Sequence, residues 1–192
     1  MSLFLRFEGV RCVRGGRTLF ERLDLAAGPE DAIEIAGPNG AGKSSLLRLA
    51  AGLLQPAAGT IERSAAVGLV DERLALDPAV TLIDALGFWT RIEGVTRDAL
   101  ADALGAMGIA GLARVPVRLL STGQRKRAAF ARLLAAPTQL WLLDEPLNGL
   151  DADGTARVTS EIRTHVAGGN AVLYASHVPI DTLFRCQRIE LG

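Results

Sequence analysis

Apolar positions that alternate with polar ones predict β-strands in several parts of the chain. Residues 3–36 alternate in this way and contain turns at Gly15–Gly16 and Gly28–Pro29, which divide them into short strands. The last of these strands is residues 31–36. Further strands are predicted at residues 59–63, 66–70, 140–143 and 170–176. The continuous apolar run 140–143 is typical of a strand that is buried on both faces of a parallel sheet.

Helical periodicity follows most of these strands. Apolar residues three or four positions apart predict helices over residues 45–51, 81–114, 122–136 and 153–166. Ser121 or Thr122 is a natural N-cap of the third helix, and Pro137 ends it. Alternation of strands and helices predicts an α/β fold. We expect a single domain, residues 1–192, with a helical insert at about residues 75–115.

The clearest chemical motif lies between the strand at 31–36 and the helix that follows it. Residues 37–44, Gly-Pro-Asn-Gly-Ala-Gly-Lys-Ser, fit the pattern G-x-x-x-x-G-K-[ST] of a phosphate-binding P-loop. In such a loop, backbone N–H groups and the positive end of the helix dipole bind phosphate oxygens. Of the 21 basic residues only Lys43 and Lys126 are lysines, and Lys43 stands where a slim cation must reach the β- and γ-phosphates. The predicted nucleotide-binding residues are Gly37, Pro38, Asn39, Gly40, Ala41, Gly42, Lys43, Ser44 and Ser45.

Acidic residues and a histidine follow two of the predicted strands. Asp144 and Glu145 come directly after the buried apolar run, and His177 follows the last predicted strand. Open α/β sheets bind their ligands at these carboxyl ends. Beside a P-loop, Ser44 and Asp144 are expected to hold Mg²⁺, Glu145 to activate the attacking water, and His177 to contact the γ-phosphate. The alternative, two solvated acids in a turn, is disfavoured by the P-loop context.

Composition and charge narrow the function further. The formal net charge is zero, so the chain lacks the basic excess that is typical of a nucleic-acid binder. Cys12 and Cys186 lie at opposite ends of the chain without metal-ligand spacing, which is typical of a reduced, cytoplasmic protein. No signal peptide and no apolar segment of about 20 residues is present. A role at a membrane would therefore need a membrane-bound partner.

Five motifs together resemble the nucleotide-binding domain of ABC transporters, over essentially the whole chain. In order and spacing they are similar to its Walker A, signature, Walker B, D-loop and switch-histidine motifs: Gly37–Ser44, Leu120–Gln124, Leu140–Glu145, Asn148–Asp151 and Ser176–His177. The resemblance implies a P-loop NTPase core of the ABC ATPase type, with an N-terminal antiparallel β subdomain and a helical insert. It also implies ATP and Mg²⁺ as ligands, and Glu145 and His177 as catalytic residues.

The resemblance also implies partners. In a head-to-tail homodimer, the signature residues of one copy would face ATP bound to the other copy, close to the D-loop residue Asp151. These signature residues are Ser121, Thr122, Gly123 and Gln124. Integral membrane transporter subunits would rest against the helical insert, which places the chain at the cytoplasmic face of the inner membrane as a peripheral subunit.

Two departures from the family pattern concern the nucleotide. Asp71-Glu72-Arg73 stands where the family usually has a glutamine, so Glu72 is a candidate Mg²⁺ ligand through a carboxylate oxygen. An aromatic residue that would stack on adenine is missing near Cys12, and the planar guanidinium of Arg14 is the candidate replacement.

Within the family, the chain is similar to the ATP-binding subunits of the haem exporter used in cytochrome c maturation. Residues 14–20 and 124–127, and Trp141 within the Walker B strand, carry this narrower resemblance. It predicts an ATP-hydrolysing subunit of a haem exporter. The alternatives are the ATPase of another ABC exporter, an ATP-binding module without hydrolysis, which Glu145 disfavours, and a soluble ABC ATPase acting on nucleic acid or ribosomes.

Overall fold

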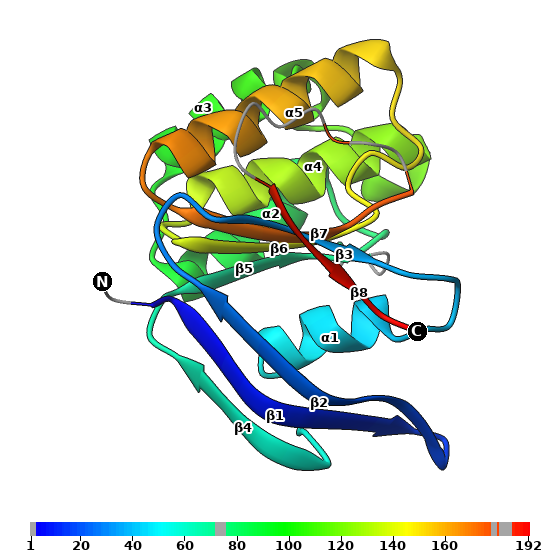
Figure 1. Ribbon diagram of the computed structural model, residues 1–192. Helices are drawn as coiled ribbons and strands as arrows, with labels where there is room; N and C mark the ends of the chain where they lie inside the picture. The colour runs from blue at the N-terminus through cyan, green and yellow to red at the C-terminus, as the bar shows by residue number, and fades with distance from the viewer. Residues whose placement is uncertain (1–2, 72–75, 178–179, 181–185) are drawn as a thin grey trace.

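A five-stranded parallel sheet forms the centre of the molecule, with the strand order β5-β6-β7-β3-β8 (Figure 1). Its strands are β3 (Ala32–Ala36), β5 (Val67–Val70), β6 (Leu140–Asp144), β7 (Ala171–Ala175) and β8 (Cys186–Glu190). The computed structural model describes residues 3–71, 76–177, 180 and 186–192. Because the strands are parallel, the loops that follow β3, β6 and β7 meet at one edge of the sheet.

A second, antiparallel sheet of three strands lies across one face of the parallel sheet, with helix α1 between the two (Figure 1). It consists of β1 (Leu5–Arg14), β2 (Arg17–Ala27) and β4 (Ala58–Arg63), and the helix is α1 (Lys43–Ala50). A core cluster joins the three layers, with Phe7 from β1, Leu46 and Leu47 from α1, and Ile33 and Leu142 from the parallel strands. The predicted N-terminal strands are therefore present.

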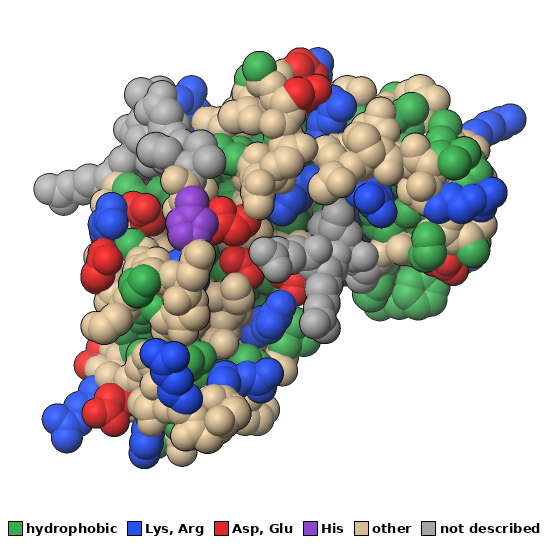
Figure 2. All heavy atoms as spheres, turned by 90° about the vertical axis from the view of Figure 1, so that its right-hand side faces the viewer, with side chains coloured by type: hydrophobic (Ala, Val, Ile, Leu, Met, Phe, Trp, Pro, Cys, Tyr) green, Lys and Arg blue, Asp and Glu red, His purple; other side chains and the backbone are tan. Residues whose placement is uncertain are grey.

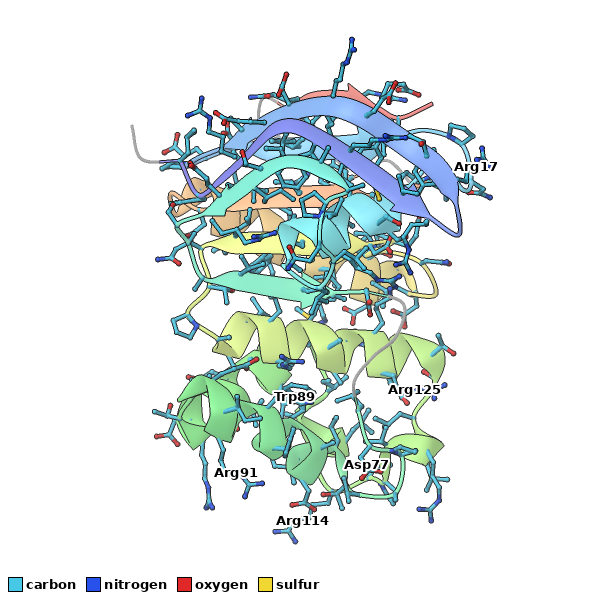
Figure 3. All side chains as sticks on the ribbon, turned by 90° about the horizontal axis from the view of Figure 1, so that it is seen from below. Arg17, Asp77, Trp89, Arg91, Arg114 and Arg125 are labelled. Carbon is cyan, nitrogen blue, oxygen red and sulfur yellow. The ribbon has the colours of Figure 1, made fainter. Side chains whose placement is uncertain are left out.

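Helices cover the other face of the parallel sheet. They are α2 (Leu82–Glu93), α3 (Arg97–Ala106), α4 (Thr122–Ala135) and α5 (Ala152–Ala167), with 3-10 turns η1 (Ala110–Leu112) and η2 (Val117–Leu119). Helices α4 and α5 pack on the sheet, and α2 and α3 lie beyond α4 (Figures 1 and 3). Helices α2 and α3 thus occupy the segment that the sequence predicts to be helical between strands.

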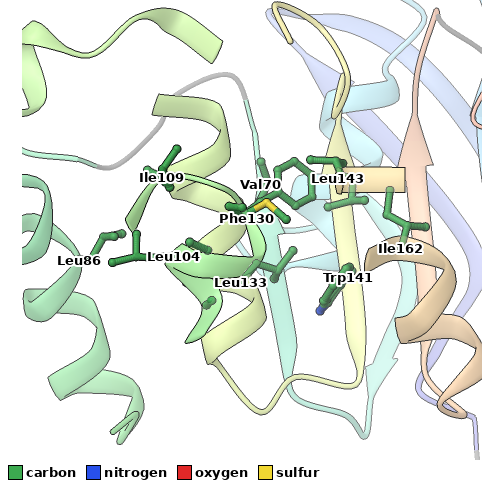
Figure 4. Packing of buried hydrophobic residues seen from close by; sticks show 14 of the residues in the cluster. Val70, Leu86, Leu104, Ile109, Phe130, Leu133, Trp141, Leu143 and Ile162 are labelled. Atoms are coloured by element: carbon green, nitrogen blue, oxygen red, sulfur yellow. The ribbon is translucent and has the colours of Figure 1, made fainter. Parts of the chain in front are cut away.

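Successive side chains of β6 point to opposite faces of the parallel sheet and pack against the layers on both sides of it. Leu140 and Leu142 belong to the cluster around α1, whereas Trp141 and Leu143 belong to the cluster under α4 and α5. In that second cluster, Phe130 and Leu133 of α4 lie between the sheet residues and the side chains of the outer helices (Figure 4). A strand that is apolar on both faces is therefore required, as the run 140–143 predicts.

One buried histidine makes this core sensitive to pH. His165 on α5 is 9% exposed, and its ring stacks on Trp141 with centroids 3.8 Å apart and planes inclined by 13°. Burial disfavours the charged ring and lowers the pKa of His165 from 6.5 to about 4, against the opposing effect of hydrogen bonds to the backbone of Ala171 and Gln139. The fold therefore accommodates the neutral ring.

From this lowered pKa we predict a loss of stability in mild acid. Well above pH 6.5 the ring is neutral in the folded and the unfolded chain, so its contribution to stability is complete. As the pH falls from 6.5 to about 4, mainly the unfolded chain takes up the proton, and the free energy of unfolding should fall by about 3 kcal/mol. Urea unfolding at about pH 7.5 and about pH 4.5 measures this loss.

The control is His165→Phe, which keeps an aromatic ring on Trp141 but has no group that titrates. Carboxylates elsewhere lower the stability of both proteins in acid, so the difference between the two proteins isolates His165. An equal pH dependence in both would contradict the assignment.

Candidate nucleotide-binding site

The loop between β3 and α1 has the backbone conformation that its glycines allow. Gly37 and Gly42 have φ values of 138° and 111°, which residues with a side chain rarely adopt. A Cβ atom on Gly37 would lie 2.2 Å from the backbone oxygen of Leu191, and one on Gly42 would lie 3.1 Å from Cβ of Leu19. The loop is therefore packed closely between β2 and the end of the chain.

Helix α1 begins without a group that competes for its N-terminus. The N-cap residue of α1 is Gly42. Among the described residues, no side chain forms a capping hydrogen bond at this helix end, and no acidic residue lies in the first turn. By contrast, Ser121 and Asp151 cap α4 and α5 with their side chains. The free N–H groups and the dipole of α1 therefore remain for an anion. Lys43 Nζ lies at the same loop, where it donates to Gly37 O (2.7 Å) and Pro38 O (3.2 Å).

Two acids and a histidine meet this loop at the carboxyl ends of β6 and β7. Asp144 is 5% exposed, and Glu145 follows it with a positive φ of 48°. The backbone N–H of His177 donates to Glu145 Oε2 (3.2 Å), and His177 Nε2 lies 3.4 Å from Glu145 Oε1. The same Nε2 is 3.1 Å from Oδ1 of Asn39. His177 thus joins the P-loop to the candidate base.

A cavity of about 570 Å³ contains most of the residues predicted to bind the nucleotide, to hold Mg²⁺ or to act in catalysis. It is lined by Arg14, Leu19, Asn39, Gly40, Gly42, Lys43, Ser44, Ser45, Asp144, Glu145, Asn148 and His177. On this face a histidine lies beside acidic side chains (Figure 2). Of the predicted nucleotide-binding residues, Gly37, Pro38 and Ala41 are outside its lining, and Gly37 lines a neighbouring cavity with Lys43 and His177.

Residues of this cavity fit both predicted ligands, ATP and Mg²⁺. Mg²⁺ is usually held by one or two carboxylates together with the phosphates of the nucleotide. Ser44 and Asp144 supply a hydroxyl and a carboxylate to one cavity, next to the anion-binding end of α1. Glu72, the third predicted ligand, lies outside the described residues.

The signature residues do not reach this cavity within one chain. Ser121 and Thr122 are exposed at the N-terminus of α4, where Ser121 Oγ accepts from the backbone N–H of Gln124 (3.2 Å) and the Gln124 side chain accepts from Ser121 N (2.9 Å). This reciprocal capping box closes the helix end. Asp151, the predicted D-loop residue, caps α5 by accepting from Gly154 N (2.8 Å).

Two site contacts are absent from the sequence-based prediction. Lys126 on α4 donates to the backbone oxygen of Glu145 (2.9 Å), and Leu19 of β2 lines the cavity. The rarity of lysine was a signal for Lys126, because arginine fills almost every other basic position. Nothing in the local pattern around Leu19 distinguishes it from an ordinary strand residue.

Similarity to known proteins identifies the class of protein to which the chain belongs. Residues 20–148 match the family profile described as "ABC transporter". Two solved structures share the fold: a metal-chelate-type ABC transporter in an inward-facing conformation (TM-score 0.78, 26% identity, 92% of this chain and 74% of the other), and an ABC transporter ATP-binding protein of Pyrococcus furiosus (TM-score 0.83, 20% identity, 97% and 96%). The chain belongs to the ABC transporter family. The predicted family and fold are confirmed.

Its curated relatives have a more specific name. A protein of Sphingopyxis alaskensis is 52% identical over 92% of this chain and 91% of its own length, and one of Novosphingobium aromaticivorans is 52% identical over 89% and 87%. A third, from Zymomonas mobilis, is 47% identical over 92% and 80%. Each is named cytochrome c biogenesis ATP-binding export protein CcmA. These relatives confirm the narrower resemblance that the sequence predicts.

Among the described residues, none of the helices has both the length and the apolarity that crossing a bilayer requires.

Proposed function

We propose that the chain hydrolyses ATP to drive the exporter that supplies haem for cytochrome c biogenesis. The observation that carries the chemistry is the Glu145–His177 pair, which lines the same cavity as Lys43, Ser44 and Asp144. The curated relatives support the pathway, because each is named as an ATP-binding export protein of cytochrome c biogenesis.

Each residue of the cavity has a role in this proposal. Backbone N–H groups of the P-loop and the ammonium of Lys43 bind the phosphates, and Arg14 stacks on the base. Glu145 accepts the proton of the attacking water, while His177 holds the γ-phosphate and the Glu145 carboxylate in position. Mg²⁺ held by Ser44 and Asp144 would neutralise charge that develops on the phosphates.

The exposed signature residues support a dimer in which each copy completes the other's site. In one chain, Ser121 and Thr122 lie outside the cavity and are exposed at the N-terminus of α4, where the positive end of the helix dipole favours a nearby negative charge. We propose that two copies pair head to tail on ATP, so that this helix end faces the γ-phosphate bound to the partner. Hydrolysis would then remove the contacts that join the two copies.

Replacement of Ser121 by Arg tests this arrangement. We expect the Ser121→Arg variant to bind ATP as one chain with a Kd within about twofold of the parent, but to lose the ATP-dependent dimer, since the larger side chain occupies the shared interface. Equilibrium titration and sedimentation velocity measure the two properties. The control is Thr96→Arg, which adds the same charge at the capped N-terminus of α3 and should dimerise normally. A normal dimer of Ser121→Arg would contradict the signature role.

A groove beside the helical layer supports the proposal that the chain binds an integral membrane subunit. A cavity of about 590 Å³ lies between β5, α2 and α4, and its lining includes Leu69, Trp89 and Arg132. The guanidinium carbon of Arg132 lies 3.9 Å from the centroid of the Trp89 ring, and Figure 3 shows Trp89 beside α4. The large apolar side chains Phe88 and Ile92 of α2 are 53% and 65% exposed. An integral membrane subunit would dock on this surface and hold the chain at the cytoplasmic side of the inner membrane.

The proposed function is tested by expression with and without the hydrophobic subunits of the exporter. We expect the chain to sediment with membranes only when those subunits are present, and the purified complex to release phosphate from ATP. Release of phosphate without any membrane retention would favour a soluble ABC ATPase. Retention of the chain on membranes without release of phosphate would indicate a module that binds ATP but does not hydrolyse it.

A further inference from the structure

We propose that Lys126 is a positioning residue that couples the signature helix to the candidate base, an inference that rests on the proposed role of Glu145. Lys126 lies in the second turn of α4 and is only 6% exposed. Its Nζ atom donates a hydrogen bond of 2.9 Å to the backbone oxygen of Glu145. Lysine is rarely buried without a partner. Here the contact joins α4 to the backbone of the base.

The backbone of Glu145 needs such support. Its φ of 48° lies in the left-handed region, which a non-glycine residue keeps only when its surroundings hold it there. The N–H of Glu145 donates to Ala175 O of β7 (2.8 Å), and its carbonyl accepts from Asn148 N (3.2 Å) as well as from Lys126. The three bonds come from β7, from the following turn and from α4.

This backbone conformation sets the direction of the carboxylate. Glu145 reaches the His177 N–H (3.2 Å) and Nε2 (3.4 Å) with its two side-chain oxygens, so a rotation of its backbone would carry both oxygens away from those partners. Lys126 is outside the lining of the nucleotide cavity. It therefore acts on the base through the backbone and not on the nucleotide.

A second contact ties the tip of α4 to the same loop. A Cβ atom on Gly123 would lie 2.8 Å from the backbone oxygen of Gly149, so the first turn of α4 packs backbone against backbone on the loop that follows Glu145. When the α4 tip closes on ATP bound to the partner, Lys126 and this loop are expected to shift together. The orientation of Glu145 in one copy would then respond to the nucleotide bound by the other.

The test is steady-state hydrolysis by the parent chain and by Lys126→Met, which keeps the length of the side chain but removes its donor. We expect kcat to fall about 10- to 100-fold because a displaced base reacts slowly, with KM and the Kd for ATP within about twofold of the parent. Lys126→Arg retains a cationic donor and should recover most of the activity. Lys126→Leu, which also lacks a donor, replaces Lys126→Met in the comparison if thermal unfolding shows that the latter does not fold.

Arg63→Met provides the matched control. Arg63 donates to the backbone oxygens of Leu49 and Ala50 at the end of α1, so the variant also loses a bond from a cation to a carbonyl, but away from Glu145. We expect it to lower thermal stability and to leave kcat within about twofold of the parent. An equal fall in kcat for both variants would show a general effect of destabilisation and overturn the proposal.

A double variant, Lys126→Met with Glu145→Gln, tests the positioning role of Lys126 separately from the proposed ATPase activity. If Lys126 acts through Glu145, Lys126→Met should lower the residual rate of Glu145→Gln by less than about twofold. A full additional loss, or a parental kcat for Lys126→Met alone, would overturn the positioning role while leaving the ATPase proposal in place. Absence of hydrolysis in the parent chain would instead contradict the proposed function itself.

Discussion

Replacement of Glu145 by Gln is expected to lower the rate of ATP hydrolysis about 100- to 10,000-fold, because an amide cannot accept the proton of the attacking water. The amide keeps the size and the hydrogen-bonding oxygen of the side chain, so the contact with His177 N–H can persist. ATP should therefore still bind, and the ATP-dependent dimer should accumulate because its γ-phosphate is not removed. Phosphate release and sedimentation velocity measure the two effects.

The control for this variant is Glu62→Gln, the same chemical change at an exposed position of β4. It should hydrolyse ATP at the parental rate and form no long-lived dimer. Parental hydrolysis by Glu145→Gln would show that another group activates the water, and the roles assigned to Glu145 and Lys126 would both be wrong.

Loss of the P-loop lysine should have the second large effect. In Lys43→Ala, the ammonium that now contacts Gly37 O and Pro38 O is gone, and the phosphates lose a charge-assisted partner. We expect the Kd for ATP to rise about 10- to 100-fold, which corresponds to the strength of hydrogen bonds to charged groups. Isothermal titration with ATP measures it.

Lys43→Arg distinguishes charge from shape at this position. It keeps the positive charge but presents a planar fork in place of a compact ammonium, and we expect its affinity for ATP to be nearer to that of Lys43→Ala than to that of the parent. An unchanged ATP titration for Lys43→Ala would rule out the P-loop as the nucleotide site.

The parts of the site that the sequence predicts are those encoded by short motifs. The P-loop is contiguous, so its residues and the helix after it are fixed by local pattern. Asp144, Glu145 and His177 could be placed together because the carboxyl ends of parallel strands meet at one edge. The cavity contains all three of these residues with Lys43.

The parts that could not be predicted depend on contacts between distant segments. Strand β8 carries mainly exposed, polar residues and is defined by its parallel pairing with β3, more than 140 positions earlier in the chain. The helical period places Lys126 on a buried face, but only the fold shows that the backbone oxygen of Glu145 is its partner. His165 likewise resembles any helical histidine until its stack on Trp141 is known.

The shared site between two copies is tested most directly by mixing two inactive variants. Lys43→Ala retains the signature residues but binds ATP weakly, whereas Ser121→Arg retains the P-loop but cannot close the partner's site. A dimer of one copy of each has one complete site. We predict that each variant alone releases little phosphate and that the mixture recovers a measurable fraction of the parental rate. Full activity of Ser121→Arg alone, or a mixture as inactive as its components, would contradict the account.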